Sequence, residues 1–133
     1  MAPKSRSESE SLVRSWGFSH VFTWTDGPYI PLLCTLQLSS IYKILPSSLS
    51  LPTPVLIFRT LLISCRNAYY PPHSHSKLTT HLIRRGSLTI TYPKDVAAGK
   101  ETFNVGARVD VDAGRVHEVW MGREGCEYVI GEM

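Results

Sequence analysis

Residues 72–90 run Pro-His-Ser-His-Ser-Lys-Leu-Thr-Thr-His-Leu-Ile-Arg-Arg-Gly-Ser-Leu-Thr-Ile, and this stretch decides the fold. His73 and His75 are two residues apart, so both side chains project from one face of an extended strand. If residues 79–83 are also extended, His81 lies on the same face of the strand as Thr79 and Ile83. Converging imidazoles suit zinc, iron, nickel and copper, so the stretch predicts a transition-metal site.

The chain from residue 67 onward consists of short segments rich in Thr, Val, Ile and Tyr, separated by turn signals. We interpret Arg85-Gly86 and residues 122–125 as two of these turns. Many short strands at even spacing predict a sandwich or barrel, and the expected fold class is all-β. The predicted strands are Tyr69–His75, Leu78–Arg84, Ser87–Tyr92, Glu101–Val105, Arg108–Val111, Val116–Met121 and Glu127–Ile130.

A second pattern ends on a further histidine: Gly-Ala-Arg-Val-Asp-Val-Asp-Ala-Gly-Arg-Val-His, residues 106–117. Together the two stretches resemble the two motifs of the cupin family. The first family motif has His-x-His, then Glu, then Gly, and the spacing from His75 to Gly86 matches it. The second ends in Pro-x-Gly, two residues and His, and the spacing from Gly114 to His117 matches that.

The sequence departs from the family pattern at two positions. Asp112 stands where the second motif has proline, and Thr79 stands where the first motif has its metal-binding glutamate. Threonine is a poor ligand for a transition metal. His81 lies two residues further on the same face of the strand and is the natural substitute.

The resemblance implies a small antiparallel jelly-roll barrel that holds a metal near its mouth. It makes His73, His75 and His117 ligands of one divalent transition metal (Fe, Mn, Ni, Cu or Zn). We expect His81 to be the fourth ligand. The alternative is a three-histidine site in which His81 lines the cavity as an acid, a base or a substrate contact.

Three further residues are candidates for lining the pocket beside the metal. Thr79 occupies the position of the missing glutamate, and Tyr70 and Trp120 are aromatic residues close to the predicted barrel mouth. The simpler interpretation of each aromatic residue is that it packs in the barrel core. No catalytic residue follows from the sequence.

The N-terminal residues 1–17 are predicted to form a polar tail and a short helix from about Glu8 to Trp16. Ser7-Glu-Ser-Glu10 fits a capping box, in which a serine and a glutamate satisfy free N–H groups of the first helical turn. We assign residues 18–28 to the barrel together with 67–133.

Residues 29–66 differ in composition from both flanks. They lack Asp, Glu and Gly, yet hold ten of the fourteen leucines of the chain, together with four prolines. An apolar connection this long is unusual in a small domain. Joining Pro28 to Asn67 restores the continuous pattern of a short cupin. We therefore expect an insertion without catalytic residues, either a translated retained intron or a lineage-specific segment.

The bulk composition narrows the choice of partners. The 133 residues carry a net charge of +3 without a basic run, which argues against nucleic acid. We interpret the polar N-terminus as lacking a signal peptide. No stretch has the roughly 18 uninterrupted apolar residues of a membrane span, so we expect no membrane partner. Three scattered cysteines favour a reducing, cytoplasmic location. We expect a small-molecule ligand or substrate, and a homodimer is one option.

Two functions remain open at this point. The first is a metal-dependent enzyme of the oxygenase, isomerase or lyase type that acts on a small molecule. The second is a non-catalytic cupin module that binds a metal or a small ligand. The fold does not decide between them, because one fold serves many chemistries.

Overall fold

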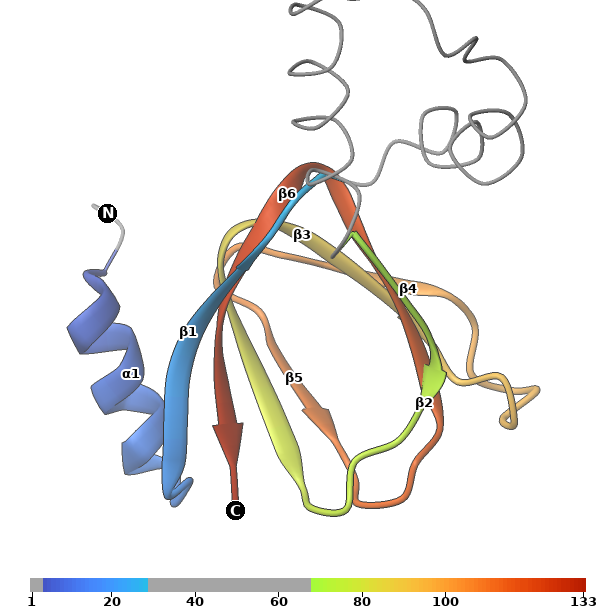
Figure 1. Cartoon of the computed structure of the whole chain (residues 1–133), viewed down its shortest axis with the longest axis horizontal. Coiled ribbons are helices and arrows are strands. Elements are labelled where there is room, and N and C mark those ends of the chain that lie inside the picture. The colour runs from blue at the N-terminus through green and yellow to red at the C-terminus, as the bar shows by residue number, and fades with distance from the viewer. Residues whose placement is uncertain (1–3, 29–67) are drawn as a thin grey trace, which may run out of the picture.

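The computed structural model describes residues 4–28 and 68–133. All of the strand pairs in this part of the chain are antiparallel. Figure 1 shows the strands curving around a common interior, with the helix on the outside beside β1. The elements are α1 (Arg6–Ser15), β1 (His20–Asp26), β2 (Tyr69–His73), β3 (Thr79–Thr91), β4 (Glu101–Asn104), β5 (Arg108–Val111) and β6 (His117–Glu132).

Two long strands form the centre of the barrel. The predicted breaks at Arg85-Gly86 and at residues 122–125 are both wrong, because β3 and β6 each run through them. Gly86 and Gly125 have φ of +73° and +76°, which glycine adopts without strain. The β3–β6 register also shifts on either side of this point. The chain therefore bends there instead of ending a strand.

Each long strand contributes its two halves to different parts of the barrel. The first half of β3 pairs with β5 and the second half with β4. The first half of β6 pairs with β2 and the second half with β1. The interior between these halves is apolar, and its buried residues are Ile83, Leu88, Ile90, Val109, Val111, Val119, Met121, Cys126 and Tyr128.

The helix begins two residues earlier than the sequence suggested, at Arg6. Its N-cap is Ser5, whose side chain accepts from the Glu8 amide, while the Glu8 carboxylate accepts from the Ser5 amide. The predicted capping box, Ser7 to Glu10, has the same Ser-x-x-Glu spacing and was therefore the wrong choice of two overlapping patterns.

Helix α1 covers the outer face of the barrel. Val13 and Phe18 are buried against Leu82 of β3 and Val129 of β6 in a second apolar cluster. A short charged network lies beside it: Glu127 accepts from both Arg84 and Arg6, at 2.9 Å from the Arg6 Nη2. Arg84 also donates to the Ser9 hydroxyl and to the Lys4 carbonyl. The helix is thus held by apolar burial together with part-buried and exposed polar contacts.

The predicted insertion 29–66 lies outside the described residues. The chain on either side of it is anchored to β6. Gly125 fits closely against the backbone of Asp26 and Pro28, and the Met121 amide donates to the Ala68 carbonyl at 2.9 Å. Both ends of the connection are therefore fixed by the barrel.

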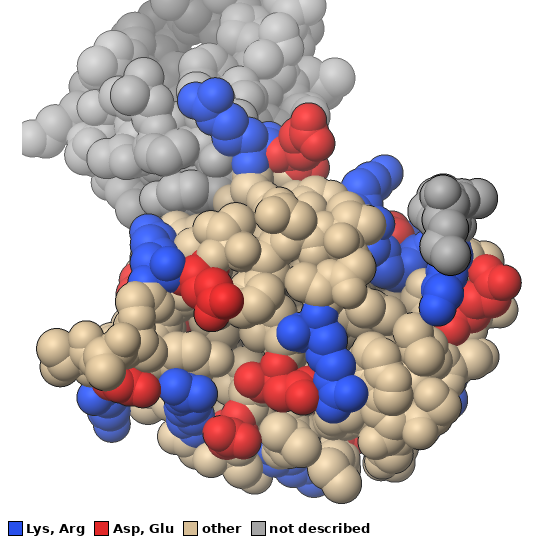
Figure 2. Space-filling view, turned by 180° about the vertical axis from the view of Figure 1, so that it is seen from behind, with Lys and Arg blue, Asp and Glu red and all other residues tan. Residues whose placement is uncertain are grey.

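The surface carries charges of both signs. On the face in Figure 2, lysines and arginines lie among aspartates and glutamates and form no extended patch of a single sign. Within residues 4–28 and 68–133, no helix has the length and apolar character needed to cross a membrane.

We predict that Gly86→Ala is more destabilising than Gly106→Ala. Both glycines have positive φ, which costs an alanine about 1–2 kcal/mol. A Cβ at Gly106 meets open space, whereas one at Gly86 would overlap the Gly125 carbonyl oxygen, and overpacking of this kind adds about 1–3 kcal/mol. Urea unfolding of both variants measures the difference. Equal losses would show that the strand crossing is not tightly packed.

We also predict that the barrel folds without residues 29–66. Removing these 38 residues from the 133 leaves 95, and Pro28 then precedes Asn67 directly. Lengthening a loop from a few residues to about forty costs only about 2 kcal/mol of closure entropy, so the shortened chain should melt at the same or a higher temperature. Calorimetry and size-exclusion chromatography test this. An unfolded or aggregated product would mean that the segment contributes to the barrel.

Candidate functional site

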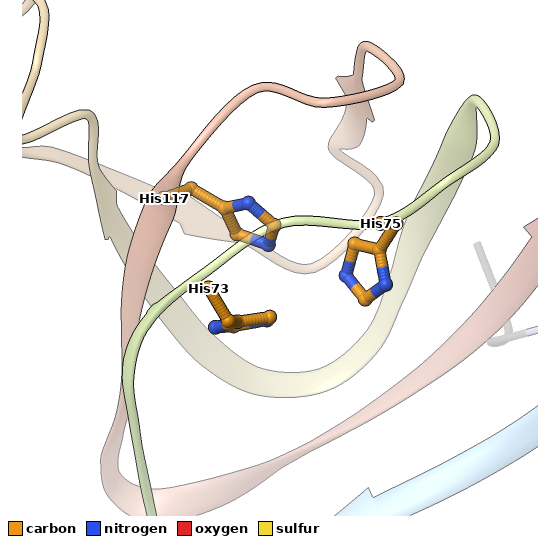
Figure 3. Close-up of side chains that lie close together, drawn as sticks. All are labelled: His73, His75 and His117. Atoms are coloured by element: carbon orange, nitrogen blue, oxygen red, sulfur yellow. The ribbon is translucent and has the colours of Figure 1, made fainter.

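Three histidines converge at one end of the barrel. His73 ends β2, His75 follows in the next loop, and His117 begins β6, where it pairs in register with His73. The ring centroids are 4.2 Å apart for His73 and His117, and 5.1 Å apart for the other two pairs. Figure 3 shows the three rings facing a common space. One nitrogen of each ring lies within 4.8 Å of the others.

Backbone carbonyls fix the tautomers of two of these rings. The Nδ1 of His73 lies 2.7 Å from the Pro71 carbonyl oxygen, and the Nδ1 of His117 lies 3.0 Å from that of Arg115. Because a carbonyl only accepts, each Nδ1 carries the proton and donates. The Nε2 of each ring therefore keeps its lone pair for a metal, which is the usual orientation of a ligating histidine.

The surroundings also favour the neutral form of His75 and His117. Burial lowers the pKa of His117, which is 2% exposed, and the nearby His73 and His75 lower it further. Burial and the neighbouring His73 likewise lower the pKa of His75. A metal binds only the neutral ring, so these shifts favour ligation at neutral pH.

The three-histidine cluster fits a divalent transition metal. Nitrogens this close need only small ring rotations to bind one ion at about 2.0–2.1 Å. Imidazole is a ligand for Zn, Fe, Ni and Cu, and three protein ligands leave at least one coordination position open. The side chains present do not select one metal among these.

A cavity of about 300 Å³ opens beside the cluster. Apart from the histidines, a tryptophan and two tyrosines, its walls are apolar. No carboxylate, thiol or lysine is found among the described residues that line it. The lining residues are Phe22, Trp24, Tyr70, His73, His75, His81, Leu88, Ile90, Val109, His117, Val119, Met121, Tyr128 and Ile130.

His81 lines this cavity but is not part of the close group. Its nitrogens are absent from the set that lies within 4.8 Å, and its ring packs on Tyr128 at 5.6 Å between centroids. Burial, together with the neighbouring His75, lowers the pKa of His81 to about 4. This placement favours the alternative in which His81 lines the cavity, while its role as a fourth ligand stays a prediction.

The three pocket candidates fall in different places. Tyr70 lines the cavity. Thr79 is buried, its hydroxyl has no hydrogen-bond partner among the described residues, and it is not in the cavity wall. Trp120 lies on the other face of β6, packed against Tyr69 and under the Lys100 ammonium. Trp120 is three positions after His117, and an odd offset along a strand places the two side chains on opposite faces.

Asp26 and Tyr128 were not among the predicted site residues. Asp26 precedes a glycine and a proline, a composition typical of a turn, but it ends β1 as a buried carboxylate. It accepts hydrogen bonds from Trp24, Tyr70 and Tyr128, all of which line the cavity. The Trp-x-Asp spacing was the available signal, because it places the indole and the carboxylate on one face of a strand.

The comparisons with known proteins address the fold. No protein-family model and no curated protein matches the sequence. A protein with a cupin-2 domain from Shewanella frigidimarina is similar in structure, with a TM-score of 0.40 and 20% identity over 47% of this chain and 58% of its own. In this chain, the two histidine motifs meet at one end of an antiparallel barrel. This is the arrangement that the resemblance to the cupin family predicts.

Two other solved structures are similar to the same extent. A protein from Neisseria meningitidis has a TM-score of 0.43 and 20% identity, over 50% of this chain and 64% of its own. A polyketide cyclase from Streptomyces resistomycificus has a TM-score of 0.41 and 20% identity, over 48% and 45%. The chain thus spans between 45% and 64% of the length of these three structures.

We predict that metal affinity depends on His73 far more than on His81. His73→Ala removes one nitrogen of the close group and should weaken binding of Zn²⁺ on the order of 100-fold or more, beyond the effect of losing an outer partner. His81→Ala should weaken it less than about tenfold. Competition with a chromogenic chelator measures both affinities.

The matched control is His20→Ala, which removes an exposed histidine of β1 and should leave the affinity unchanged. If His81→Ala weakens binding as much as His73→Ala does, His81 is a fourth ligand. If none of the variants differs from the parent protein, the metal site lies elsewhere.

Proposed function

We propose that this protein is a cupin and a metal-dependent enzyme that acts on a small molecule. The observation that supports this proposal is the position of the three-histidine cluster in the wall of the 300 Å³ cavity. That volume lies at the lower end of the range for small-molecule sites, about 300–1,000 Å³. A metal held there would have its open coordination positions directed at a bound ligand.

The residues around the cluster divide the work. His73, His75 and His117 bind the ion, and the two backbone carbonyls hold His73 and His117 in the ligating tautomer. A divalent ion at this site supplies Lewis acidity to a bound oxygen atom.

The cavity walls act on the ligand itself. Leu88, Ile90 and Val119 exclude water around it, which strengthens electrostatic interactions inside the cavity. The neutral His81 ring offers one lone pair and one N–H to a ligand in the same space.

The charge balance favours an oxygen-rich ligand. The described lining contains no acidic side chain, so three neutral imidazoles leave the ion with its full positive charge. Such a centre attracts the anionic oxygen of a substrate, or dioxygen when the metal is redox-active. This arrangement is compatible with oxygenase, isomerase and lyase chemistry. The compartment that we propose for the protein is the cytoplasm.

A second function, a non-catalytic binding module, is favoured by a different observation. The described cavity lining contains no carboxylate, lysine or thiol, so the usual nucleophiles and carboxylate bases are missing. In this version the same site holds a metal and a small ligand for sensing or structure. The two versions differ in whether the ligand is converted.

We predict that Co²⁺-loaded protein binds azide. An open coordination position lets the anion reach the ion and change the visible absorption of Co²⁺, whereas an ion filled by protein ligands alone gives no change. The Phe103→Leu variant, which alters an apolar residue outside the cavity lining, should respond as the parent does. An unchanged spectrum at saturating azide would contradict an open, catalytic centre.

An oxygen-uptake screen of the Fe²⁺-loaded protein with small organic acids then separates the two functions. Consumption of dioxygen that depends on both substrate and metal supports the oxygenase version. Azide binding without conversion of any compound supports the binding module.

A further inference from the structure

A buried carboxylate lies behind the cavity wall. Asp26 is 3% exposed and accepts three hydrogen bonds. The Tyr128 hydroxyl donates to Oδ2 at 2.5 Å, the Tyr70 hydroxyl donates to Oδ1 at 2.9 Å, and the Trp24 Nε1 donates to Oδ1 at 2.8 Å. All three donors line the cavity, but Asp26 itself does not. The carboxylate therefore acts on the cavity through these three side chains.

The hydrogen bonds decide what the two phenols offer to a ligand. Burial, together with the Asp26 charge, raises the pKa of Tyr70 to about 12. Burial and Asp26 raise the pKa of Tyr128 as well. Both hydroxyls keep their protons, and both protons are directed to Asp26. Each phenol oxygen then retains only lone pairs, so a ligand can only donate to it.

The phenols lie next to the histidines. The Tyr70 ring is 6.1 Å from the His73 ring, and the Tyr128 ring is 5.6 Å from the His81 ring, measured between centroids. A molecule bound to the three-histidine cluster therefore extends past one or both tyrosines. Its polar groups away from the cluster can meet the two phenol oxygens or the His81 ring, because most of the remaining wall is apolar.

We propose that Tyr70 and Tyr128 form an acceptor pair that selects ligands with a hydroxyl or amine group. Asp26 is the positioning residue that holds both protons away from the ligand. The negative charge behind the rings disfavours an anionic group there and favours the positive end of an O–H or N–H bond. The ligand class is a small molecule with an apolar body, one anionic oxygen for the metal and one donor group.

This proposal rests on the proposed metal site, and the experiment separates the two. The Zn²⁺-loaded protein is titrated calorimetrically with benzoate, 3-hydroxybenzoate and 4-hydroxybenzoate. In these hydroxylated acids the hydroxyl cannot reach the same ion as the carboxylate. At least one of them should bind about tenfold tighter than benzoate, the effect of one added buried hydrogen bond. Its methoxy analogue, which lacks the donor, should lose this advantage.

The variants test which residues carry the preference. Tyr70→Phe and Tyr128→Phe each keep the ring and remove one acceptor, so at least one of them should abolish the preference while benzoate affinity holds. Asp26→Asn should weaken the preference. Its amide keeps one acceptor oxygen in place of two, so it no longer accepts a hydrogen bond from both phenols. Tyr92→Phe is the control, because Tyr92 is partly buried but outside the cavity, and this variant should keep the full preference.

If the hydrogen bonds around Asp26 had only a structural role, the variants would change the stability of the protein. They would not change the ratio of the affinities for the hydroxylated acid and for benzoate. If the protein takes up no Zn²⁺, the proposal of a metal site is wrong. The proposal of an acceptor pair is tested separately, by the affinities of the Zn²⁺-loaded protein. It is overturned if Zn²⁺ binds and neither hydroxylated acid exceeds benzoate, or if the preference persists in both Phe variants. Should Asp26→Asn fail to fold, the two Phe variants and the Tyr92 control decide the question.

Discussion

The pairing of β3 with β6 is the constraint on which the other strands depend. The register runs from Thr79 opposite Glu132 to Thr91 opposite Glu118, and each remaining described strand adds to one edge of this pair. Both long strands bend at the same place, where Gly86 lies opposite Cys126 and against the Gly125 carbonyl. A side chain at that crossing would separate the strands, because the backbones approach too closely for a Cβ. The bend wraps both halves of each strand around one interior.

The candidate site is a consequence of that bend. His117 opens the first half of β6 and pairs with His73 on β2, whereas His81 lies on the first half of β3 and reaches the cavity from the other side. The inward positions also change parity at the bend: Met121 and Cys126 are both in the core although they are five residues apart. Residues distant in the sequence therefore face one cavity of about 300 Å³.

The histidine positions were predictable, because they depend only on alternation within a strand and on the spacing of two motifs. The strand bend was not, since Arg85-Gly86 has the same composition whether a strand ends or bends there, and only the opposing Gly125 decides it. Asp26 was missed for a related reason. Next to a glycine and a proline it resembles a turn residue, and its buried state depends on Tyr70 and Tyr128, which lie 44 and 102 positions away.

Asp26 connects the cavity to the rest of the barrel. A buried carboxylate is costly without donors, and the three that surround it come from β1, β2 and β6. Its bond to Tyr70 also joins the end of β1 to the start of β2, the two strands that flank residues 29–67. The barrel therefore fixes both ends of that connection through contacts that do not depend on the length of the connection. We therefore expect the closure entropy of a longer loop, about 2 kcal/mol, to lower the stability of the barrel without changing the geometry of the cavity.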